Sequence, residues 1–367
     1  MGIRNLPGKL FTQRLLGDKN TGKQRIKNNL HQPQQSTYIE NLTCQQVRDV
    51  FRPLVFMASF PNRLEPLTLI SSMKRRQFLG AALGAGALAT SLPLHAREPA
   101  QKELPPVPLV QLTKDVKCSR IGFGTGMRGG MRQTNLTRIG WEKGIPLLRF
   151  AYDHGVRLFD CADLYGTHWM VAEALKDKPR DSYALVSKIW VRPGGIPEKE
   201  RLGADELVPR YLKELKTDYI DVVQIHCMDK DNWSTEYAPY LEQLETLKKK
   251  GAIRAHGISS HSNIATEHAS KTPWNDVVHI RINSEGMSMD GPKDDPAVCV
   301  AEAVRTAKLC KDAGQGIIAM KVIGEGRMKD DPAMRKKSAE FVKKHVDVLI
   351  VGFEEISQVE EFILNVV

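Results

Sequence analysis

Short runs of apolar residues alternate with longer stretches of helical period from about residue 120 to the end of the chain. The apolar runs are rich in Val, Ile and Leu and stop abruptly at polar residues, which is typical of strands buried on both faces in a parallel sheet. The predicted strands are 120–124, 156–160, 184–188, 220–226, 255–259, 277–281, 316–321 and 346–352. The stretches between them repeat apolar residues every three or four positions, which predicts amphipathic helices. These helices are 141–154, 169–176, 204–215, 237–250, 263–271, 297–312, 332–344 and 357–364.

The order of the predicted elements indicates the fold class. Strands that each precede a helix, eight times over, predict an α/β protein built as a (β/α)8 TIM barrel. A barrel of this kind is one domain, so residues 110–367 need no division although the whole chain has 367 residues. Active sites of such barrels form at the carboxyl ends of the strands, so the side chains that end each strand are the first candidates for chemistry.

The first 109 residues differ from the barrel in composition. Residues 1–72 are rich in Gln, Asn, Pro and basic residues and show no sustained period, so we assign them no fold. Residues 73–96 begin with Met-Lys-Arg-Arg and continue as an apolar, small-residue run, which resembles a twin-arginine signal peptide. The Pro-rich residues 97–109 predict a stiff, extended linker.

The leader-like segment predicts where the protein goes and where its chain starts. We expect an export machinery as partner and a periplasmic or otherwise exported mature protein, or a cytoplasmic one if the leader is not used. The apolar stretch 78–92 is shorter than the roughly twenty residues that span a bilayer, and an amphipathic basic helix or weak membrane anchor is the alternative. Because export signals normally begin a chain, we also expect translation to start at Met73.

Composition narrows the function classes. The chain has a formal charge of +10, but residues 1–96 carry 13 basic and 4 acidic residues, and the remainder carries 40 basic and 39 acidic ones. A nearly neutral body gives nucleic-acid binding no electrostatic support. The cysteines show no paired or zinc-like spacing, so we expect small buried side chains, no disulfide framework and no metal. They are Cys44, Cys118, Cys161, Cys227, Cys299 and Cys310.

A glycine motif follows the first predicted barrel strand. The sequence Gly124-Thr125-Gly126-Met127-Arg128-Gly129 fits the G-x-G-x-x-G pattern of dinucleotide-binding turns. That pattern requires a helix directly after it, whereas polar residues and another glycine follow here. We therefore predict a flexible loop over the barrel mouth rather than a Rossmann phosphate site.

Three consecutive predicted strands end in residues suited to proton transfer. Asp160 ends the second strand, Lys188 the third and His226 the fourth, and Tyr165 comes five residues after Asp160. Each has an ordinary structural interpretation: a turn aspartate, a rim lysine, a core histidine and a packing tyrosine. Their joint occurrence at one predicted mouth favours a catalytic cluster over four unrelated structural roles.

An aspartate placed five residues before a tyrosine at this strand end resembles the signature of the aldo-keto reductases. The resemblance extends from about Val110 to the C-terminus. It implies that Asp160, Tyr165, Lys188 and His226 are the catalytic residues of an oxidoreductase, with NADP(H) or NAD(H) as cofactor and a small-molecule carbonyl compound as substrate. It also implies that residues 110–117 form a short β-hairpin that closes the barrel floor, and that the protein is a monomer.

The chemistry of these residues suits that function. Hydride transfer to a carbonyl leaves an alkoxide, which needs a proton from a general acid. A free tyrosine has a pKa near 10 and is a poor acid at neutral pH. An ammonium about 4 Å away, at an effective dielectric constant of about 20, favours the phenolate by roughly 4 kcal/mol, or up to about three pKa units. We therefore expect Lys188 to acidify Tyr165, Asp160 to hold Lys188, and His226 to orient the substrate oxygen.

Segments after the later strands resemble the cofactor-binding segments of the same family. The resemblance assigns Ser259 and Ser260 to the nicotinamide carboxamide, with His279 as a further polar contact, whereas Ile282 stands where a stacking tyrosine is usual. It assigns the loops after the last two strands to the pyrophosphate and the adenosine phosphate. With the end of the first strand included, the predicted cofactor residues are Gly124, Thr125, Ser259, Ser260, His279, Lys321, Gly324, Gly326, Arg327, Gly352, Glu354 and Gln358.

Glu354 bears on the choice between the two cofactors. It stands where an arginine for the 2′-phosphate of NADP(H) is often found, and a carboxylate there would repel that phosphate. NADP(H) is implied by the family, but Glu354 keeps NAD(H) open.

Two hypotheses remain at this point, and a third is discounted. The absent tyrosine and an open pocket, with Trp190 and Met228 as predicted walls, leave room for a cofactor-binding sensor with vestigial turnover. A barrel glycosidase would need two carboxylates at the mouth, where His226 and Lys321 stand instead. Reduction of an aldehyde or ketone is the leading hypothesis.

Overall fold

The computed structural model describes residues 103–367. The predicted extension 1–72, the signal-like segment 73–96 and residues 97–102 of the predicted linker lie outside the described residues. Residues 103–108 have no regular secondary structure, and the first strand begins at Leu109. Within the described part of the chain, no helix combines the length and apolar character needed to cross a membrane.

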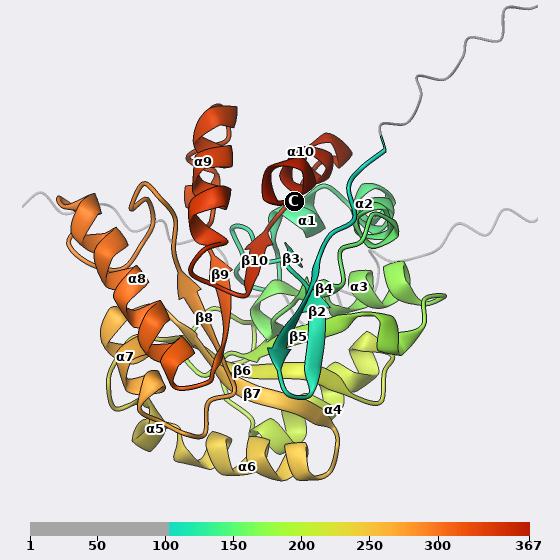
Figure 1. Cartoon of the computed structure of the whole chain (residues 1–367). Coiled ribbons are helices and arrows are strands. Elements are labelled where there is room, and N and C mark those ends of the chain that lie inside the picture. The colour runs from blue at the N-terminus through green and yellow to red at the C-terminus, as the bar shows by residue number, and fades with distance from the viewer. Residues whose placement is uncertain (1–102) are drawn as a thin grey trace, which may run out of the picture. The chain divides into compact units, whose positions relative to one another are not determined.

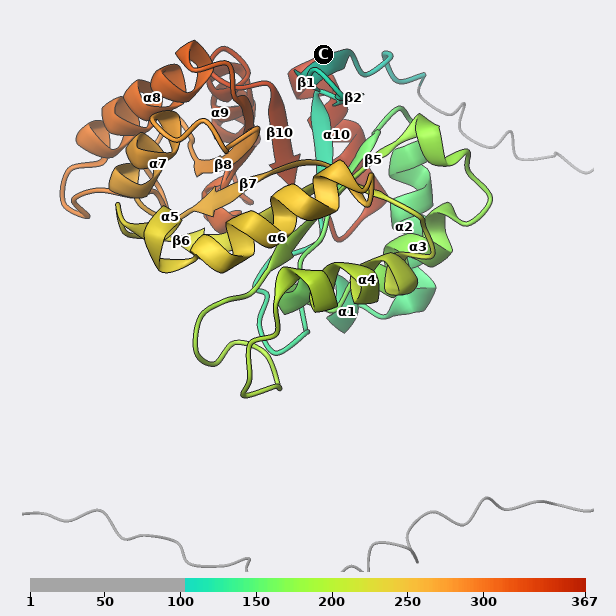
Figure 2. The same ribbon diagram turned by 90° about the horizontal axis from the view of Figure 1, so that it is seen from below.

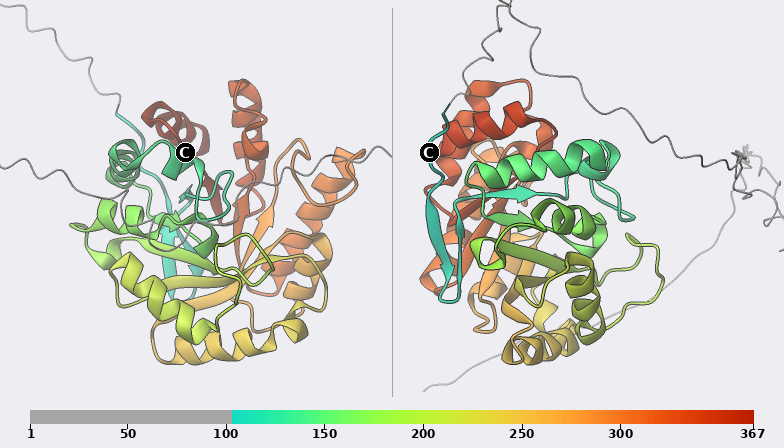
Figure 3. Two further views of the ribbon diagram at one scale, coloured as in Figure 1. Left: turned by 180° about the vertical axis from the view of Figure 1, so that it is seen from behind. Right: turned by 90° about the vertical axis from the view of Figure 1, so that its right-hand side faces the viewer.

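A β-hairpin precedes the barrel, as predicted. Its strands β1 (Leu109–Thr113) and β2 (Val116–Ser119) pair antiparallel. Leu112 and Val116 belong to one hydrophobic cluster with residues from the interior of the barrel, including Leu158. The hairpin therefore packs against the amino-terminal ends of the barrel strands. Its two strands are drawn in cyan in the right panel of Figure 3.

Eight parallel strands close into a barrel, which confirms the predicted fold class (Figure 1). Each strand pairs with its neighbours in sequence, and the last pairs with the first. The strands are β3 (Ile121–Gly124), β4 (Leu158–Asp160), β5 (Ala184–Ile189), β6 (Ile220–Met228), β7 (Ile253–Ser260), β8 (Val277–Arg281), β9 (Gly316–Met320) and β10 (Val348–Val351). All eight predicted strands exist, with small shifts at their ends.

Helices surround the barrel, as the views from below and from the side show (Figures 2 and 3). The helices that follow the strands are α2 (Trp141–Asp153), α3 (His168–Leu175), α4 (Ala204–Leu215), α6 (Ala238–Lys249), α7 (Asn263–Ser270), α8 (Pro296–Asp312), α9 (Pro332–Val342) and α10 (Ile356–Val366). Their apolar faces pack on the outward side chains of the strands and form the large hydrophobic core between the two layers. All of these helices were predicted.

The barrel interior changes character from floor to mouth. Val222 on β6 belongs to the apolar cluster at the floor. Because inward side chains recur every second residue, Gln224 and His226 form the next two interior layers of the same strand. Both are buried, at 0% and 3% exposure. The polar interior therefore lies toward the carboxyl ends of the strands, where the chemistry was predicted.

Short helices in the loops were not predicted. They are α1 (Asn135–Arg138), α5 (Trp233–Glu236), and the 3-10 helices η1 (Asp163–Tyr165), η2 (Arg180–Ser182) and η3 (Gly324–Gly326). Helix α1 corrects one sequence argument, because it begins soon after the glycine motif. Its capping box joins Thr134 and Thr137 through backbone and side-chain hydrogen bonds. One turn of helix nevertheless differs from the long helix that a Rossmann phosphate site requires.

Candidate active site

A short turn after β4 holds Tyr165 at the barrel mouth. The strand ends at Asp160, and η1 carries Tyr165 as its last residue. Gly166 follows with a φ of +66°, a left-handed conformation that glycine adopts without strain. A Cβ atom at Gly166 would also lie 2.3 Å from the carbonyl oxygen of Arg132. The Tyr-Gly sequence therefore allows both the turn and the close approach of the preceding loop.

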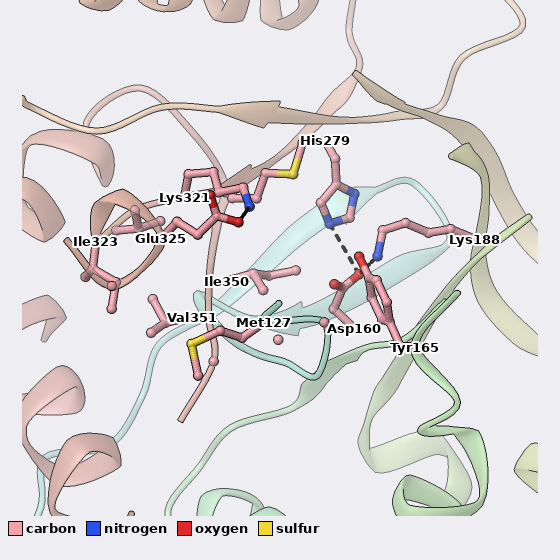
Figure 4. A pocket seen from close by; sticks show the side chains of 16 residues that line it. Met127, Asp160, Tyr165, Lys188, His279, Lys321, Ile323, Glu325, Ile350 and Val351 are labelled. Atoms are coloured by element: carbon pink, nitrogen blue, oxygen red, sulfur yellow. Dashed lines mark hydrogen bonds and ion pairs between the residues drawn. The ribbon is translucent and has the colours of Figure 1, made fainter. Parts of the chain in front are cut away.

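Asp160, Lys188 and Tyr165 converge at one end of a pocket (Figure 4). The Lys188 ammonium donates to Oδ1 of Asp160 and, at 2.9 Å, to the carbonyl oxygen of Cys161. Its Nζ atom lies 5.1 Å from the centre of the Tyr165 ring. Lys188 and Asp160 are 1% and 5% exposed. Both charges are therefore removed from water and depend on each other for compensation.

His226 joins this cluster from β6. Its Nε2 atom lies 3.4 Å from the Tyr165 hydroxyl, and the two rings meet edge to face at 5.5 Å. Burial lowers the pKa of His226 well below its ordinary value, and the Lys188 ammonium lowers it further. The imidazole is therefore neutral at pH 7. The four residues predicted to be catalytic lie together at the mouth.

The Asp160 carboxylate is the anionic centre of the cluster. Burial opposes its ionisation, but Lys188 and His279 outweigh burial and lower the pKa of Asp160 below its ordinary value. Nε2 of His279 lies 3.4 Å from the same Oδ1 atom that Lys188 contacts. Asp160 therefore stays ionised and balances the charge of Lys188.

The predicted acidification of Tyr165 is wrong. Burial raises the pKa of Tyr165 well above its ordinary value, and the Asp160 carboxylate raises it further. The physical reason is that Lys188 and Asp160 form a pair, so the phenol is close to a neutral pair rather than a lone ammonium. Tyr165 is therefore fully protonated at neutral pH, which keeps its proton available for donation.

The pocket beside Tyr165 extends along the ends of the neighbouring strands. It contains about 660 Å3 of space that protein atoms do not fill, and this volume includes the open solvent at its mouth. Apolar side chains make up much of its wall, and none of them carries a chemical signature in the sequence. They include Met127, Met320, Val322, Ile323, Ile350 and Val351.

The glycine motif has a different role from a phosphate-binding turn. A Cβ atom at Gly126 would lie 2.3 Å from Cζ of Tyr165, and one at Gly129 would lie 2.9 Å from Cδ1 of the same ring. The loop therefore lies directly on the Tyr165 ring. Gly124 and Gly126 also line the pocket. The predicted position over the barrel mouth agrees with the structure.

Buried polar atoms test whether the barrel interior fits the predicted cofactor. Among the described residues, Oε1 of Gln224, Oγ of Ser259 and Nδ1 of His279 have no hydrogen-bond partner. They come from the adjacent strands β6, β7 and β8, and Ser259 pairs with His279 in the sheet. A buried polar atom without a partner is costly. Of the three residues, His279 also lines the pocket, and its ring fits a polar ligand group such as a carboxamide, which can both donate and accept.

Two predicted cofactor residues use their hydroxyl groups within the protein instead. Oγ1 of Thr125 donates to the carbonyl oxygen of Asp160 at 2.8 Å. Oγ of Ser260 donates to the carbonyl oxygen of Ser262 at 2.8 Å. Both side chains are 1% exposed, so they brace the strand ends rather than face the pocket.

The loop after β9 forms another wall of the pocket. Lys321 lines it, and Nζ of Lys321 lies 2.5 Å from Oε1 of Glu325. Gly326 also lines the pocket, and Gly324 is buried beside it. The Arg327 side chain is exposed, outside the pocket wall. Glycines with φ values of +59° and +84° give this loop its shape.

The β10–α10 loop lies next to the glycine motif. Gly352 lines the pocket. Farther out, Glu354 accepts a hydrogen bond from Nδ2 of Asn135 at 2.7 Å, and its backbone N–H donates to Oε1 of Gln358 at 2.8 Å. Helix α10 begins at Ile356 and has no side-chain cap. Uncapped N–H groups at a helix start suit an anionic group.

The two predicted substrate-wall residues have different positions. The Trp190 ring stands edge-on to the His226 ring at 5.4 Å, so it lies beside the cluster. Met228 is 2% exposed and packs in the core between strands and helices. A bulge in β6 between Ile225 and Met228 shifts the register there, so Met228 does not continue the inward alternation of Gln224 and His226. Ile282, at the predicted stacking position, is also buried in the core.

Comparison with known proteins decides the family. A model described as "Aldo/keto reductase family" matches residues 120–363. The chain belongs to the aldo/keto reductase family. This match runs from β3 into α10 and includes all four residues of the cluster.

Curated relatives resemble parts of this aldo/keto reductase. "Probable aldo-keto reductase 1" of Glycine max is 26% identical over 236 residues, which are 62% of this chain and 61% of the relative. "Aldo-keto reductase YhdN" of Bacillus subtilis is 31% identical over 178 residues, which are 44% of this chain and 51% of the relative. The matched part of this chain thus spans about half to three fifths of the length of these relatives.

Solved structures share the fold of this aldo/keto reductase. An aldo-keto reductase of Bacillus halodurans in its holo form has a TM-score of 0.55 and 20% identity, over 71% of this chain and 91% of that chain. An aldo/keto reductase of Klebsiella pneumoniae, in complex with NADP and acetate, has a TM-score of 0.53 and 19% identity, over 70% and 89%. At these identities the similarity concerns the fold.

Proposed function

We propose that this protein transfers hydride between a nicotinamide cofactor and a small carbonyl compound, reducing an aldehyde or ketone to an alcohol or catalysing the reverse reaction. The single observation that supports this most is the cluster of Tyr165, His226, Lys188 and Asp160 at the end of an open pocket. Membership of the family supports the same reaction class.

Each residue of the cluster has a defined task in this proposal. The cofactor supplies the hydride when bound. Tyr165 donates its proton to the carbonyl oxygen as negative charge develops there. His226 is neutral, and when Nε2 carries its proton it can donate to the same oxygen and orient it. Two of the three Lys188 protons are used by Asp160 and Cys161, which leaves one N–H that can donate to the Tyr165 oxygen after the proton has left it.

Steady-state reduction of a simple aldehyde tests the proposal. The wild-type protein is assayed with NADPH and with NADH beside a Tyr165→Phe variant. Rapid turnover that depends on the Tyr165 hydroxyl supports the enzyme. Equal slow rates for both proteins would favour the alternative, a cofactor-binding sensor on the same barrel.

The pH dependence of the two directions should differ. Because the pKa of Tyr165 is raised well above its ordinary value, the proton donor persists from about pH 6 to pH 9, and kcat for reduction should be nearly constant there. Alcohol oxidation needs the phenolate as base, so its kcat should rise by up to tenfold per pH unit. His226 is neutral throughout. Initial rates in both directions check this, and a reduction rate that falls with a midpoint near pH 7 would contradict it.

Cofactor choice should depend on Glu354. We propose that the cofactor lies along Gly124, Lys321 and Gly352, with its adenosine end near the start of α10. The carboxylate of Glu354 would then repel a 2′-phosphate, so kcat/KM with NADH should equal or exceed that with NADPH. Glu354→Arg should raise kcat/KM for NADPH by about tenfold, which is about 1.4 kcal/mol. Glu242→Arg is the control, because it makes the same charge change at an exposed residue of α6. A strong NADPH preference of the wild type would refute the argument.

We propose in addition that residues 73–96 direct export by a twin-arginine route and that the mature protein is a monomer. The paired arginines at positions 75 and 76 and the short apolar run support the first proposal. Cell fractionation of the wild type and of an Arg75→Lys, Arg76→Lys variant separates export from retention. Sedimentation of the mature protein tests the monomer.

A further inference from the structure

A buried carboxylate stands two residues before Tyr165 in the chain. Asp163 is in the same 3-10 helix as Tyr165, and its side chain is 2% exposed. Oδ1 of Asp163 accepts from Nε and Nη2 of Arg132 at 3.1 and 3.0 Å. Nη2 of Arg210, on α4, lies 2.7 Å from the same oxygen. Both guanidinium groups lie against Oδ1 and compensate its buried charge, whereas Oδ2 of Asp163 has no hydrogen-bond partner among the described residues. We call Asp163, Arg132 and Arg210 the mouth clamp.

Arg132 contacts the turn through its backbone as well. Its N–H donates to the carbonyl oxygen of Leu164 at 3.0 Å. Arg132 and Met131 both have left-handed backbones, with φ values of +56° and +51°. Such conformations persist in residues other than glycine only where surrounding contacts determine them, and they concentrate at functional sites. Arg132 therefore contacts the helix that carries Tyr165 through both its main chain and its side chain.

The same residue connects a second loop to the site. Nη1 of Arg132 lies 2.6 Å from Oε1 of Glu198, and the backbone N–H of Met131 donates to the carbonyl oxygen of Gly195 at 2.7 Å. Both partners belong to the loop between β5 and α4, which also contains Trp190. The glycine-rich loop that lies on the Tyr165 ring and the loop beside His226 are thus joined at Arg132.

We propose that Arg132 is a positioning residue for Tyr165. The guanidinium fork fixes the Asp163 end of the helix, and the loop that carries Arg132 places Gly126 and Gly129 against the Tyr165 ring. The Tyr165 side chain is therefore held between the 3-10 helix that contains Asp163 and the loop that contains Gly126 and Gly129. Arg132 does not itself contact the reacting atoms. This role rests on the proposed function of Tyr165 as proton donor.

A second clamp of the same composition provides a matched control. Asp221 is 2% exposed at its side chain, lies 2.7 Å from Nη2 of Arg180 and 2.9 Å from Nη1 of Arg254, and stands at the start of β6. The amino-terminal end of that strand is at the barrel floor, opposite the catalytic mouth. Arg132→Met and Arg254→Met each remove one guanidinium from a buried carboxylate that keeps its other arginine.

Kinetics of these variants test the proposal. Arg132→Met should lower kcat for aldehyde reduction by about tenfold or more, because small displacements of a catalytic group have large effects on rate. KM for the cofactor should stay within about twofold, since Arg132 does not line the pocket. Arg132→Lys should recover part of kcat, because it restores the charge but not the two-pronged contact. Arg132→Met and Arg254→Met should each lower the midpoint of thermal unfolding by a few degrees. Arg254→Met should nevertheless leave kcat unchanged.

A spectroscopic measurement tests the same point without any turnover. With 13Cζ-labelled tyrosine, the Tyr165 resonance is assigned by its loss in Tyr165→Phe. It should shift in Arg132→Met and stay in place in Arg254→Met. An unchanged resonance and unchanged kcat in Arg132→Met would overturn the proposal, as would equal losses of kcat in both arginine variants. A wild type that reduces no carbonyl refutes the proposed function instead, and the resonance still decides whether Arg132 positions Tyr165.

Discussion

Tyr165→Phe is expected to lower kcat for aldehyde reduction by about 10²- to 10⁴-fold, the usual contribution of a positioned general acid. The variant loses only the hydroxyl that lies 3.4 Å from Nε2 of His226, and phenylalanine fills the same space against Gly126 and Gly129. Cofactor affinity should therefore stay within about twofold. Steady-state rates at saturating aldehyde, and cofactor titration followed by protein fluorescence, measure the two effects separately.

A second buried tyrosine is the control for this substitution. Tyr211 on α4 is 0% exposed, and its hydroxyl has no hydrogen-bond partner within the part of the chain that the structure describes. Tyr211→Phe therefore removes a buried hydroxyl that lies outside the catalytic cluster, and its kcat should match the wild type. Activity in Tyr165→Phe within a few fold of the wild type would reject the assignment of Tyr165 as proton donor.

Most of the barrel could be predicted from the sequence because each of its elements has a local signature. Apolar runs such as 220–226 are buried on both faces, and this requirement leaves a continuous pattern. Helices such as 204–215 show a clear apolar stripe. The short helices α1 and η1 have no room for a repeated pattern, so single-turn elements such as Asp163–Tyr165 were missed.

That Asp160, Lys188 and His226 lie together could be predicted, but their electrostatics could not. Asp160, Lys188 and His226 end successive strands, and barrel geometry alone brings such residues together. The pKa of Tyr165 depends on burial and on the direct pairing of Lys188 with Asp160, and neither is visible in residue spacing. The closeness of these residues was therefore predictable from the sequence. The effect of the surrounding charges on the pKa of Tyr165 required the structure.

The residues of the mouth clamp could not be predicted from the sequence either. Arg132 and Asp163 are 31 positions apart, and an arginine in a loop has no periodic or spacing signature. The glycines at 126 and 129 did leave a signal, since their spacing matched a phosphate-binding motif, and the residues after them led us to predict a loop over the mouth instead. Their actual neighbour is the Tyr165 ring. Such contacts arise from tertiary packing, which a sequence pattern does not encode locally.

Lys188→Met is expected to lower the free energy of unfolding by about 3–5 kcal/mol at pH 7.5, because it leaves the buried Asp160 carboxylate without its main counter-charge. Adding Asp160→Asn should recover part of this loss, giving a coupling free energy of about 2–3 kcal/mol between the two sites. Urea denaturation of the wild type, the two single variants and the double variant measures it. Lys230→Met, which breaks the exposed 3.3 Å pair with Glu236, should change stability by less than about 1 kcal/mol.

The loss of stability in Lys188→Met should depend on pH. In the wild type the pKa of Asp160 is lowered, so its contribution to stability is present above the pKa of the unfolded carboxyl, about 3.9, and fades as the pH falls through the lower folded value. Without Lys188, burial should raise the pKa of Asp160, and protonation then relieves the unpaired charge. The difference between wild type and Lys188→Met should therefore shrink from pH 7.5 to pH 5. A difference that grows on acidification, or a double variant less stable than Lys188→Met, would show that Lys188 is held by something other than Asp160.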